Sequence, residues 1–122
     1  MAKILIVDDS NVMRSLLAEF LTDAGHQVET SDNGEDGLRK ALTGQFDLCI
    51  CDTHMPKLNG YQLLCRITSE KPDLPLVFTD SMPDKLTEKI QQAGSYHCLR
   101  KPFELNQLRS ILDQILISVK SS

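Results

Sequence analysis

Short apolar segments alternate along this chain with segments in which apolar residues recur every three or four positions. The first apolar segment, KILIVDD at 3–9, is rich in Val, Ile and Leu and ends in two acids, and DLCICD at 47–52 also ends in an acid. A short, nearly continuous apolar segment is typical of a strand that is buried on both faces of its sheet. The periodic segments between them predict amphipathic helices.

Five strands and five helices are expected in strict alternation. The other strands are expected at 27–31, 76–79 and 97–100, and the helices between Ser10 and Gly25, between an Asn33-Gly34 turn and Gly44, and at about 61–70, 84–93 and 104–119. Parallel neighbours need crossover connections, which are right-handed and place helices on both faces of the sheet. The predicted fold class is therefore α/β, a doubly wound five-stranded parallel sheet with five helices.

Two local features are expected from residue type and spacing. The apolar face of the first helix is expected to consist of Val12, Met13, Leu16, Leu17, Phe20 and Leu21. The segment THMPKLNG at 53–60 is expected to be an irregular loop, because Pro56 and the Asn59-Gly60 pair disfavour regular structure.

Composition narrows the classes of function. With 122 residues, 41% of them hydrophobic and 25% charged, the chain is expected to form one domain over 1–122. A net charge of −4 without a basic stripe argues against nucleic-acid binding through this domain. No apolar run reaches the ~20 residues of a membrane-spanning helix and no signal-peptide core is evident, so a cytoplasmic protein without membrane association is expected.

The four cysteines are Cys49, Cys51, Cys65 and Cys98, and none lies in C-x-x-C spacing. Cys49 and Cys51 are expected on the same face of a strand, which leaves a thiolate metal site as a minor alternative. Buried free thiols that act as small hydrophobic residues fit the spacing better.

In a doubly wound sheet, ligands bind beyond the carboxyl ends of the strands. The residues expected there are Asp8 and Asp9 after the first strand, Asp52 after the third, Thr79 and Asp80 after the fourth, and Lys101 after the fifth. Two carboxylates 4 Å apart repel by roughly 4 kcal/mol at an effective dielectric near 20, so their clustering requires a cation. Oxygen ligands with room for water and a phosphate favour Mg²⁺ over Ca²⁺, and Mn²⁺ is an acceptable substitute.

These residue types support chemistry at Asp52. A carboxylate can take a phosphoryl group covalently when positive charge nearby offsets the charge on the transferring oxygens, and Mg²⁺ and Lys101 would supply that charge. The Thr79 hydroxyl can donate to a phosphoryl oxygen. Each residue also has an ordinary explanation, as a turn acid, a β-branched strand residue or a surface charge; their joint placement makes coincidence a poor explanation.

The sequence resembles the receiver domain of two-component response regulators over essentially its whole length. The motifs that carry the resemblance are ILIVDDS at 4–10, D-x-x-M-P-x-x-x-G from Asp52 to Gly60, LVFT at 76–79, Ala93-Gly94, and KPF at 101–103. The resemblance implies a flavodoxin-like strand order of 2-1-3-4-5. It also implies a signalling protein rather than a metabolic enzyme.

The resemblance further implies a role for each site residue. Asp8 and Asp9 would form the acidic pair of the Mg²⁺ site, which Asp52 and the backbone carbonyl of His54 complete. Asp52 would be phosphorylated from a sensor histidine kinase or a phosphotransfer protein, with Thr79 and Lys101 contacting the phosphoryl group. A downstream protein partner, unidentified by the sequence, would bind the surface formed by 84–119.

The chain departs from the family pattern at two positions. Asp80 stands where a small Ala or Gly is usual, and Cys98 stands where an aromatic residue is usual. Tyr96 is expected on the same face of the strand as Cys98, and it is either a substitute for the missing aromatic residue or a structural residue. These departures leave open an interaction module that works without phosphorylation. A metal-dependent phosphatase is a weaker alternative, because the D-x-D spacing is absent. The His54 side chain is either an exposed loop group or a modulator of the site.

Overall fold

Five parallel strands form one sheet in the order β2-β1-β3-β4-β5 in the computed structural model, which describes residues 1–81, 84–94 and 96–121. The elements are β1 (Lys3–Val7), α1 (Asn11–Asp23), β2 (Gln27–Ser31), α2 (Gly34–Thr43), β3 (Leu48–Asp52), α3 (Gly60–Glu70), β4 (Leu76–Asp80), α4 (Lys85–Ala93), β5 (His97–Arg100) and α5 (Leu105–Ser121). The predicted fold class, element order and strand order are confirmed.

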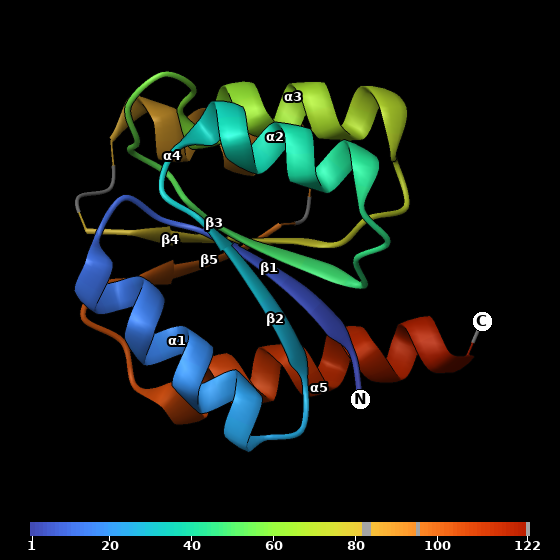
Figure 1. Cartoon of the computed structure of the whole chain (residues 1–122). Coiled ribbons are helices and arrows are strands. Elements are labelled where there is room, and N and C mark those ends of the chain that lie inside the picture. Colours follow the sequence, from blue (N-terminus) through green and yellow to red (C-terminus); the bar gives the residue numbers. More distant parts are fainter. Residues whose placement is uncertain (82–83, 95, 122) are drawn as a thin grey trace.

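Helices cover both faces of this sheet. Figure 1 shows α1 and α5 on one face and α2, α3 and α4 on the other. Because side chains alternate along a strand, Ile4 and Ile6 pack toward α1 and α5, whereas Leu5 and Val7 pack toward the other three helices. Two hydrophobic cores therefore flank β1, β3 and β4, which explains why their sequences are nearly continuous in apolar residues.

Strands β3 and β4 are buried along their whole length, including the aspartate that ends each one. Asp80 was expected after the fourth strand but is its last residue, paired in register with Arg100 of β5. Its carbonyl accepts a hydrogen bond of 2.6 Å from the Lys101 amide, which extends the ladder by one step. A buried polar residue thus continues the strand where residue type alone predicted its end.

Two Asn-Gly pairs begin helices. The loop expected at 53–60 is irregular as far as Asn59, but Gly34 and Gly60 are the first residues of α2 and α3 and not parts of a turn or loop. The Asn33 side chain accepts from the Asp36 amide at 2.9 Å, and Asn59 forms a capping box with Gln62 at 2.9 and 3.0 Å. Asn is a preferred N-cap because its oxygen satisfies an amide of the first helical turn. The predicted N-cap Ser10 is confirmed by its bond to the Met13 amide.

The apolar face expected for α1 is only partly buried. Leu17 and Leu21 are fully buried, and Met13 and Phe20 pack at the edge of the core, but Val12 is 79% exposed and Leu16 is 44% exposed. Periodicity predicted the helix correctly and overestimated the width of the face that the sheet covers.

Gly60 is where the start of α3 touches the end of β3. A Cβ atom at this position would lie 2.8 Å from the Thr53 Cα and 2.9 Å from the Asp52 carbonyl oxygen. Both neighbours are backbone atoms, so a side chain cannot be accommodated by a rotamer change. The glycine that ends the D-x-x-M-P-x-x-x-G motif therefore sets the distance between α3 and the strand that carries Asp52.

We predict that Gly60→Ala lowers the free energy of unfolding by about 1–3 kcal/mol, because the methyl group must push α3 away from β3. Urea denaturation followed by circular dichroism measures the change. Ser69→Ala, at an exposed position of the same helix, is the control and should shift stability by less than about 0.5 kcal/mol. Equal stability of Gly60→Ala and the wild type would contradict the close contact.

Candidate functional site

Three aspartates meet at the carboxyl ends of β1 and β3. One carboxylate oxygen from each of Asp8, Asp9 and Asp52 lies within 4.8 Å of the other two. Asp8 is 2% exposed and Asp52 is 7% exposed, while Asp9 faces solvent. The parallel register places the ends of both strands at the same edge, since Val7 pairs with Cys51. The sequence prediction that these acids cluster is confirmed.

Lys101 connects the fifth strand to this cluster. Its Nζ lies 3.0 Å from Asp8 Oδ2 and 3.6 Å from Asp52 Oδ2. The other Asp8 oxygen, Oδ1, accepts from the Ser10 amide at 2.9 Å, so Asp8 is held from both sides. Lys101 precedes Pro102 through a cis peptide bond and is mostly buried. One ammonium group thus faces two buried carboxylates from different strands.

Asp52 has an unusual affinity for protons. The pKa of Asp52 is raised to about 6, first by burial and then by the neighbouring Asp8 charge, while Lys101 and a hydrogen bond from the His54 backbone amide act in the opposite direction. One ammonium does not neutralise three carboxylates. Oxygen ligands with a net negative charge suit a hard divalent cation, so the residues present fit Mg²⁺.

Thr79 lies beside Asp52, because β3 and β4 pair Asp52 with Thr79. Its hydroxyl is the one buried side-chain polar atom without a hydrogen-bond partner in the part of the chain that the structure describes. The neighbouring Thr53 hydroxyl, in contrast, donates to the Thr79 carbonyl at 3.0 Å. Buried hydroxyl groups are nearly always bonded. An unbonded hydroxyl next to Asp52 is therefore available to an incoming acceptor.

The His54 side chain is exposed and lies in a loop, which agrees with one of its two expected environments, and it also has acidic neighbours. It is 41% exposed, and its Nε2 lies 3.7 Å from Asp80 Oδ1 and 3.3 Å from Asp84 Oδ2. Asp84 was not among the residues singled out in the sequence. The DKLT pattern at 84–87 is a capping box that marks the start of α4, but nothing in the sequence indicates that this start faces His54.

Asp80 and Cys98, the two residues that depart from the family pattern, lie on the face of the sheet opposite to Thr79. Asp80 has the parity of Phe78, which packs toward α2, α3 and α4, and its carboxylate accepts a hydrogen bond from the Thr87 hydroxyl. Cys98 is half-buried against the same core. Tyr96 lies next to it and packs its ring edge-to-face on Phe78, with centroids 5.9 Å apart. Tyr96 is thus anchored in the core.

Cys49 and Cys51 share one face of β3, as expected. Their sulfurs are 3.3 Å apart and both residues are fully buried. The hydrogen bond to Cys49 and burial raise the pKa of the Cys51 thiol, which favours the protonated form over a metal-binding thiolate. Both cysteines pack as core residues.

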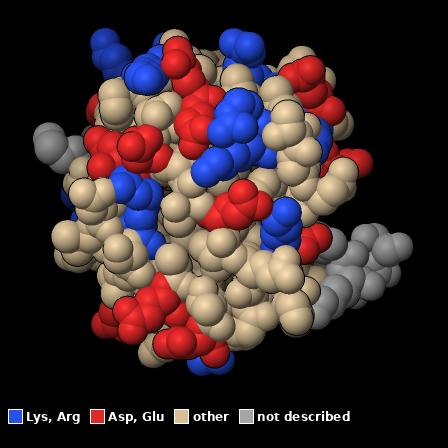
Figure 2. Space-filling view, in the orientation of Figure 1, with Lys and Arg blue, Asp and Glu red and all other residues tan. Residues whose placement is uncertain are grey.

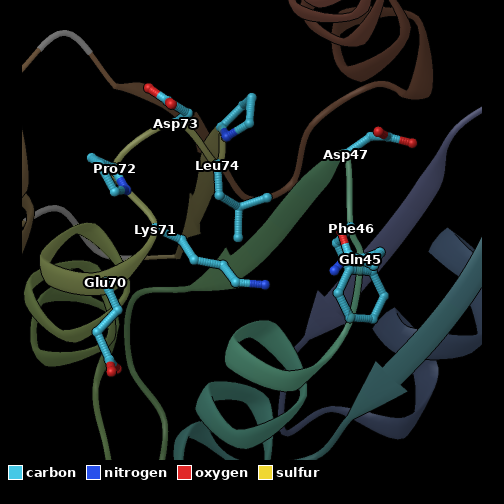
Figure 3. Close-up of a pocket in the computed structure, with 9 residues that line it drawn as sticks. Gln45, Phe46, Asp47, Glu70, Lys71, Pro72, Asp73 and Leu74 are labelled. Atoms are coloured by element: carbon cyan, nitrogen blue, oxygen red, sulfur yellow. The ribbon is translucent and has the colours of Figure 1, made fainter.

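A cavity of about 420 Å³ lies at the opposite edge of the sheet (Figure 3). It is lined by 45–47, before β3, and by 70–75, before β4. Lys71 extends across it and donates to the Gly44 carbonyl at 2.8 Å. The three clustered aspartates lie at the carboxyl ends of β1 and β3, so this cavity is separate from them.

The surface charges do not form a basic stripe on the face shown in Figure 2. Acidic and basic side chains are interspersed there.

The comparisons with known proteins agree with this geometry. The family model for the response regulator receiver domain matches residues 4–113. The chain belongs to this family. The receiver domain is 36% identical over 118 residues to the DNA-binding transcriptional regulator NtrC of Azospirillum brasilense, covering 96% of this chain and 24% of NtrC.

Two solved structures show the same fold. Vibrio cholerae chemotaxis protein CheY4 is 31% identical with a TM-score of 0.82, covering 94% of this chain and 98% of CheY4. Response regulator protein TrrA of Thermotoga maritima, described in complex with Mg²⁺-BeF, is 28% identical with a TM-score of 0.82, covering 94% of this chain and 99% of TrrA. The receiver domain spans a quarter to a half of the curated relatives it matches first. Among the described helices, none is long and apolar enough to cross a membrane.

We predict that Asp52→Asn raises the free energy of unfolding of the metal-free protein at pH 8 by about 2 kcal/mol. The full pKa shift of Asp52 corresponds to roughly 3 kcal/mol, and the expected gain is smaller because solvent screens the charge at this edge of the sheet. The folded pKa of about 6 lies above the ordinary value of 3.8. Ionised Asp52 therefore opposes folding above pH 6, and the difference disappears as the pH falls below 4.

Urea denaturation in EDTA at several pH values measures this effect. Asp73→Asn, at an exposed position at the opposite edge of the sheet, is the control and should shift stability by less than about 0.5 kcal/mol at every pH. A stability gain for Asp52→Asn that did not change between pH 8 and pH 4 would contradict a raised pKa.

Proposed function

We propose that this receiver domain accepts one phosphoryl group on Asp52 in a Mg²⁺-dependent reaction and responds by changing a partner-binding surface. The observation that carries this proposal is the buried, unbonded hydroxyl of Thr79 beside Asp52. Lys101 lies within 3.6 Å of the same carboxylate. A nucleophile, a cation and a free donor thus surround one point, as phosphoryl transfer requires.

In the proposed reaction, an Asp52 oxygen attacks the phosphorus of a phosphohistidine on a sensor histidine kinase or a phosphotransfer protein. The new P–O bond forms as the P–N bond breaks, and the leaving imidazole keeps the electron pair and takes a proton. Asp8, Asp9, Asp52 and the backbone carbonyl of His54 would hold Mg²⁺, with Mn²⁺ as a substitute. The bound ion would neutralise charge on the phosphoryl oxygens.

The residues around Asp52 then have separate roles. Lys101, held against Asp8 and Asp52, would shift toward a phosphoryl oxygen once that oxygen brings more negative charge. The Thr79 hydroxyl would donate to a second oxygen and so acquire the partner that it lacks. Because the product is a modified protein and not a released compound, the domain acts in signalling and not as a metabolic enzyme.

Several features of the whole protein follow from this proposal. We expect 1–122 to act as one receiver domain in the cytoplasm, where its phosphoryl donor works. The downstream partner is a protein that binds the surface formed by α4, β5 and α5. This domain itself does not bind nucleic acid or a membrane. The comparisons give no support to the alternative of a module that works without phosphorylation.

We predict that incubation with Mg²⁺ and a small phosphodonor such as acetyl phosphate adds the mass of one phosphoryl group to the intact protein. Asp52→Asn should gain none, because the nucleophilic oxygen is lost, and EDTA should abolish labelling of the wild type. Asp73→Asn is the matched control and should label like the wild type. Intact-protein mass spectrometry reads all four samples, and equal labelling of Asp52→Asn would place the modification elsewhere.

Thr79→Val and Thr53→Val form a matched pair at neighbouring buried threonines. Thr79→Val should raise the stability of the unmodified protein by up to about 1 kcal/mol, because it removes a buried polar atom that has no partner. Thr53→Val should lower stability by about 1–2 kcal/mol, because its hydroxyl bonds the Thr79 carbonyl.

The two variants should also differ in how much Mg²⁺ and beryllofluoride, a mimic of the phosphoryl group, raise their melting temperatures. Thermal denaturation should show a smaller gain in melting temperature for Thr79→Val than for the wild type, and a normal gain for Thr53→Val. If Thr79→Val lost as much stability as Thr53→Val and kept the full response, the Thr79 hydroxyl would have no role in the phosphorylated state.

A further inference from the structure

A second group of metal-ligating atoms lies outside the cluster of Asp8, Asp9 and Asp52. His54 Nε2, a carboxylate oxygen of Asp80 and a carboxylate oxygen of Asp84 all lie within 4.8 Å of one another. They come from three segments, which are the connection between β3 and α3, the last residue of β4 and the residue before α4. This group combines one imidazole with two carboxylates, so it differs in chemistry from the all-carboxylate cluster.

Each carboxylate in this group has one oxygen held by the protein and the other near His54. Asp84 Oδ1 accepts from the Leu86 amide at 2.9 Å, and Asp84 Oδ2 lies 3.3 Å from His54 Nε2. Asp80 Oδ2 accepts from the Thr87 hydroxyl, and Asp80 Oδ1 lies 3.7 Å from the same nitrogen. Hydrogen bonds that fix one oxygen of a ligating carboxylate orient the other toward a metal.

The spacing of these atoms suits a transition metal. Zn²⁺ binds imidazole nitrogen and carboxylate oxygen at about 2.0–2.2 Å, so two ligand atoms of a tetrahedral site lie about 3.4 Å apart. The distances of 3.3 and 3.7 Å from His54 Nε2 to the two oxygens are within a few tenths of an ångström of this value. Asp80 is 2% exposed, which holds its oxygen in place, while His54 remains 41% exposed and open to an entering ion.

We propose that His54, Asp80 and Asp84 form a second metal site, specific for a first-row transition metal dication of the Zn²⁺ class, that joins the β3–α3 connection to the start of α4. The imidazole ligand selects against Mg²⁺, which binds oxygen ligands and demands octahedral geometry. Three protein ligands leave a fourth position for water. None of its three side-chain ligands belongs to the cluster of Asp8, Asp9 and Asp52. The site gives Asp80 a role at a position where a small residue is usual in the family.

The test is titration of the full chain with Zn²⁺, by isothermal calorimetry, in the presence of excess Mg²⁺ that occupies the three-aspartate cluster. All proteins carry Cys65→Ser, because the Cys65 thiol is exposed. One equivalent of Zn²⁺ should bind. His54→Gln and Asp84→Ser should each weaken this binding by at least about 30-fold, since each removes one of three ligands.

Asp84→Ser is designed to keep the fold intact. Serine is as good an N-cap as aspartate, so its single oxygen can satisfy the start of α4 while none remains for the metal. Circular dichroism checks that the variant is folded. A matched control, Asp9→Asn, removes a carboxylate from the other cluster and should leave the Zn²⁺ affinity unchanged within about twofold.

Thr87 tests the positioning of both carboxylates, because its hydroxyl donates to the Asp80 oxygen that does not face His54 and accepts from the Asp84 amide at 3.3 Å. Thr87→Val should weaken Zn²⁺ binding about 10-fold. Thr87→Ser, which retains the hydroxyl, should bind Zn²⁺ as tightly as the wild type. Co²⁺ gives a second readout, since its visible spectrum should show nitrogen and oxygen ligation without a thiolate charge-transfer band.

Three results would overturn the proposal. These are no Zn²⁺ binding in excess Mg²⁺, equal affinity in the wild type and in folded Asp84→Ser, and loss of the site in Asp9→Asn instead of His54→Gln. None of these outcomes bears on phosphorylation of Asp52, which the mass measurement tests separately.

Discussion

The close approach of the carboxylates of Asp8 and Asp52 is the interaction on which the rest of this receiver domain depends. Asp8 follows β1, Asp52 is the last residue of the neighbouring parallel strand β3, and both are almost fully buried. Their mutual repulsion would separate the strand ends if Lys101 Nζ did not lie 3.0 Å from one and 3.6 Å from the other. Burial and, after it, the Asp8 charge raise the pKa of Asp52 to about 6.

The sheet supplies the rigidity that keeps these charges together. Packing on both faces of β1 and β3 fixes where each strand ends, so the aspartates cannot move apart without disturbing a core. The close contact at Gly60 and the capping box of Asn59 fix the connection that follows Asp52. The apolar contacts of the two cores thus position the polar residues at the carboxyl ends of the strands, where ligands bind in a doubly wound fold.

Much of this could be predicted from the sequence, because it depends on local patterns. Buried strands such as β3 have a continuous apolar sequence, and parallel connectivity then collects Asp8, Asp52 and Lys101 at one edge. What could not be predicted depends on long-range contacts or on ambiguous residue types. Asn-Gly occurs both in turns and at helix starts, and the exposure of Val12 depends on where the sheet ends and not on helical period.

The surroundings of His54 are a second example of information that the sequence does not contain. Asp80 and Asp84 are 26 and 30 positions further along the chain, and they reach His54 only because β4 lies next to β3 and α4 begins at the same edge. No spacing motif of consecutive residues describes such a group. The group exists only because three separate segments of the chain meet in the fold.

The bond between Thr53 and Thr79 has a consequence for motion. The Thr79 carbonyl accepts from both the amide and the hydroxyl of Thr53, at 2.9 and 3.0 Å, so the main chain of Thr79 is tied to the end of β3. Only its side chain lacks such restraint. If phosphorylation of Asp52 draws the Thr79 hydroxyl toward the phosphoryl group, as we propose, the hydroxyl can turn by rotation about the Cα–Cβ bond while both hydrogen bonds to the Thr79 carbonyl persist.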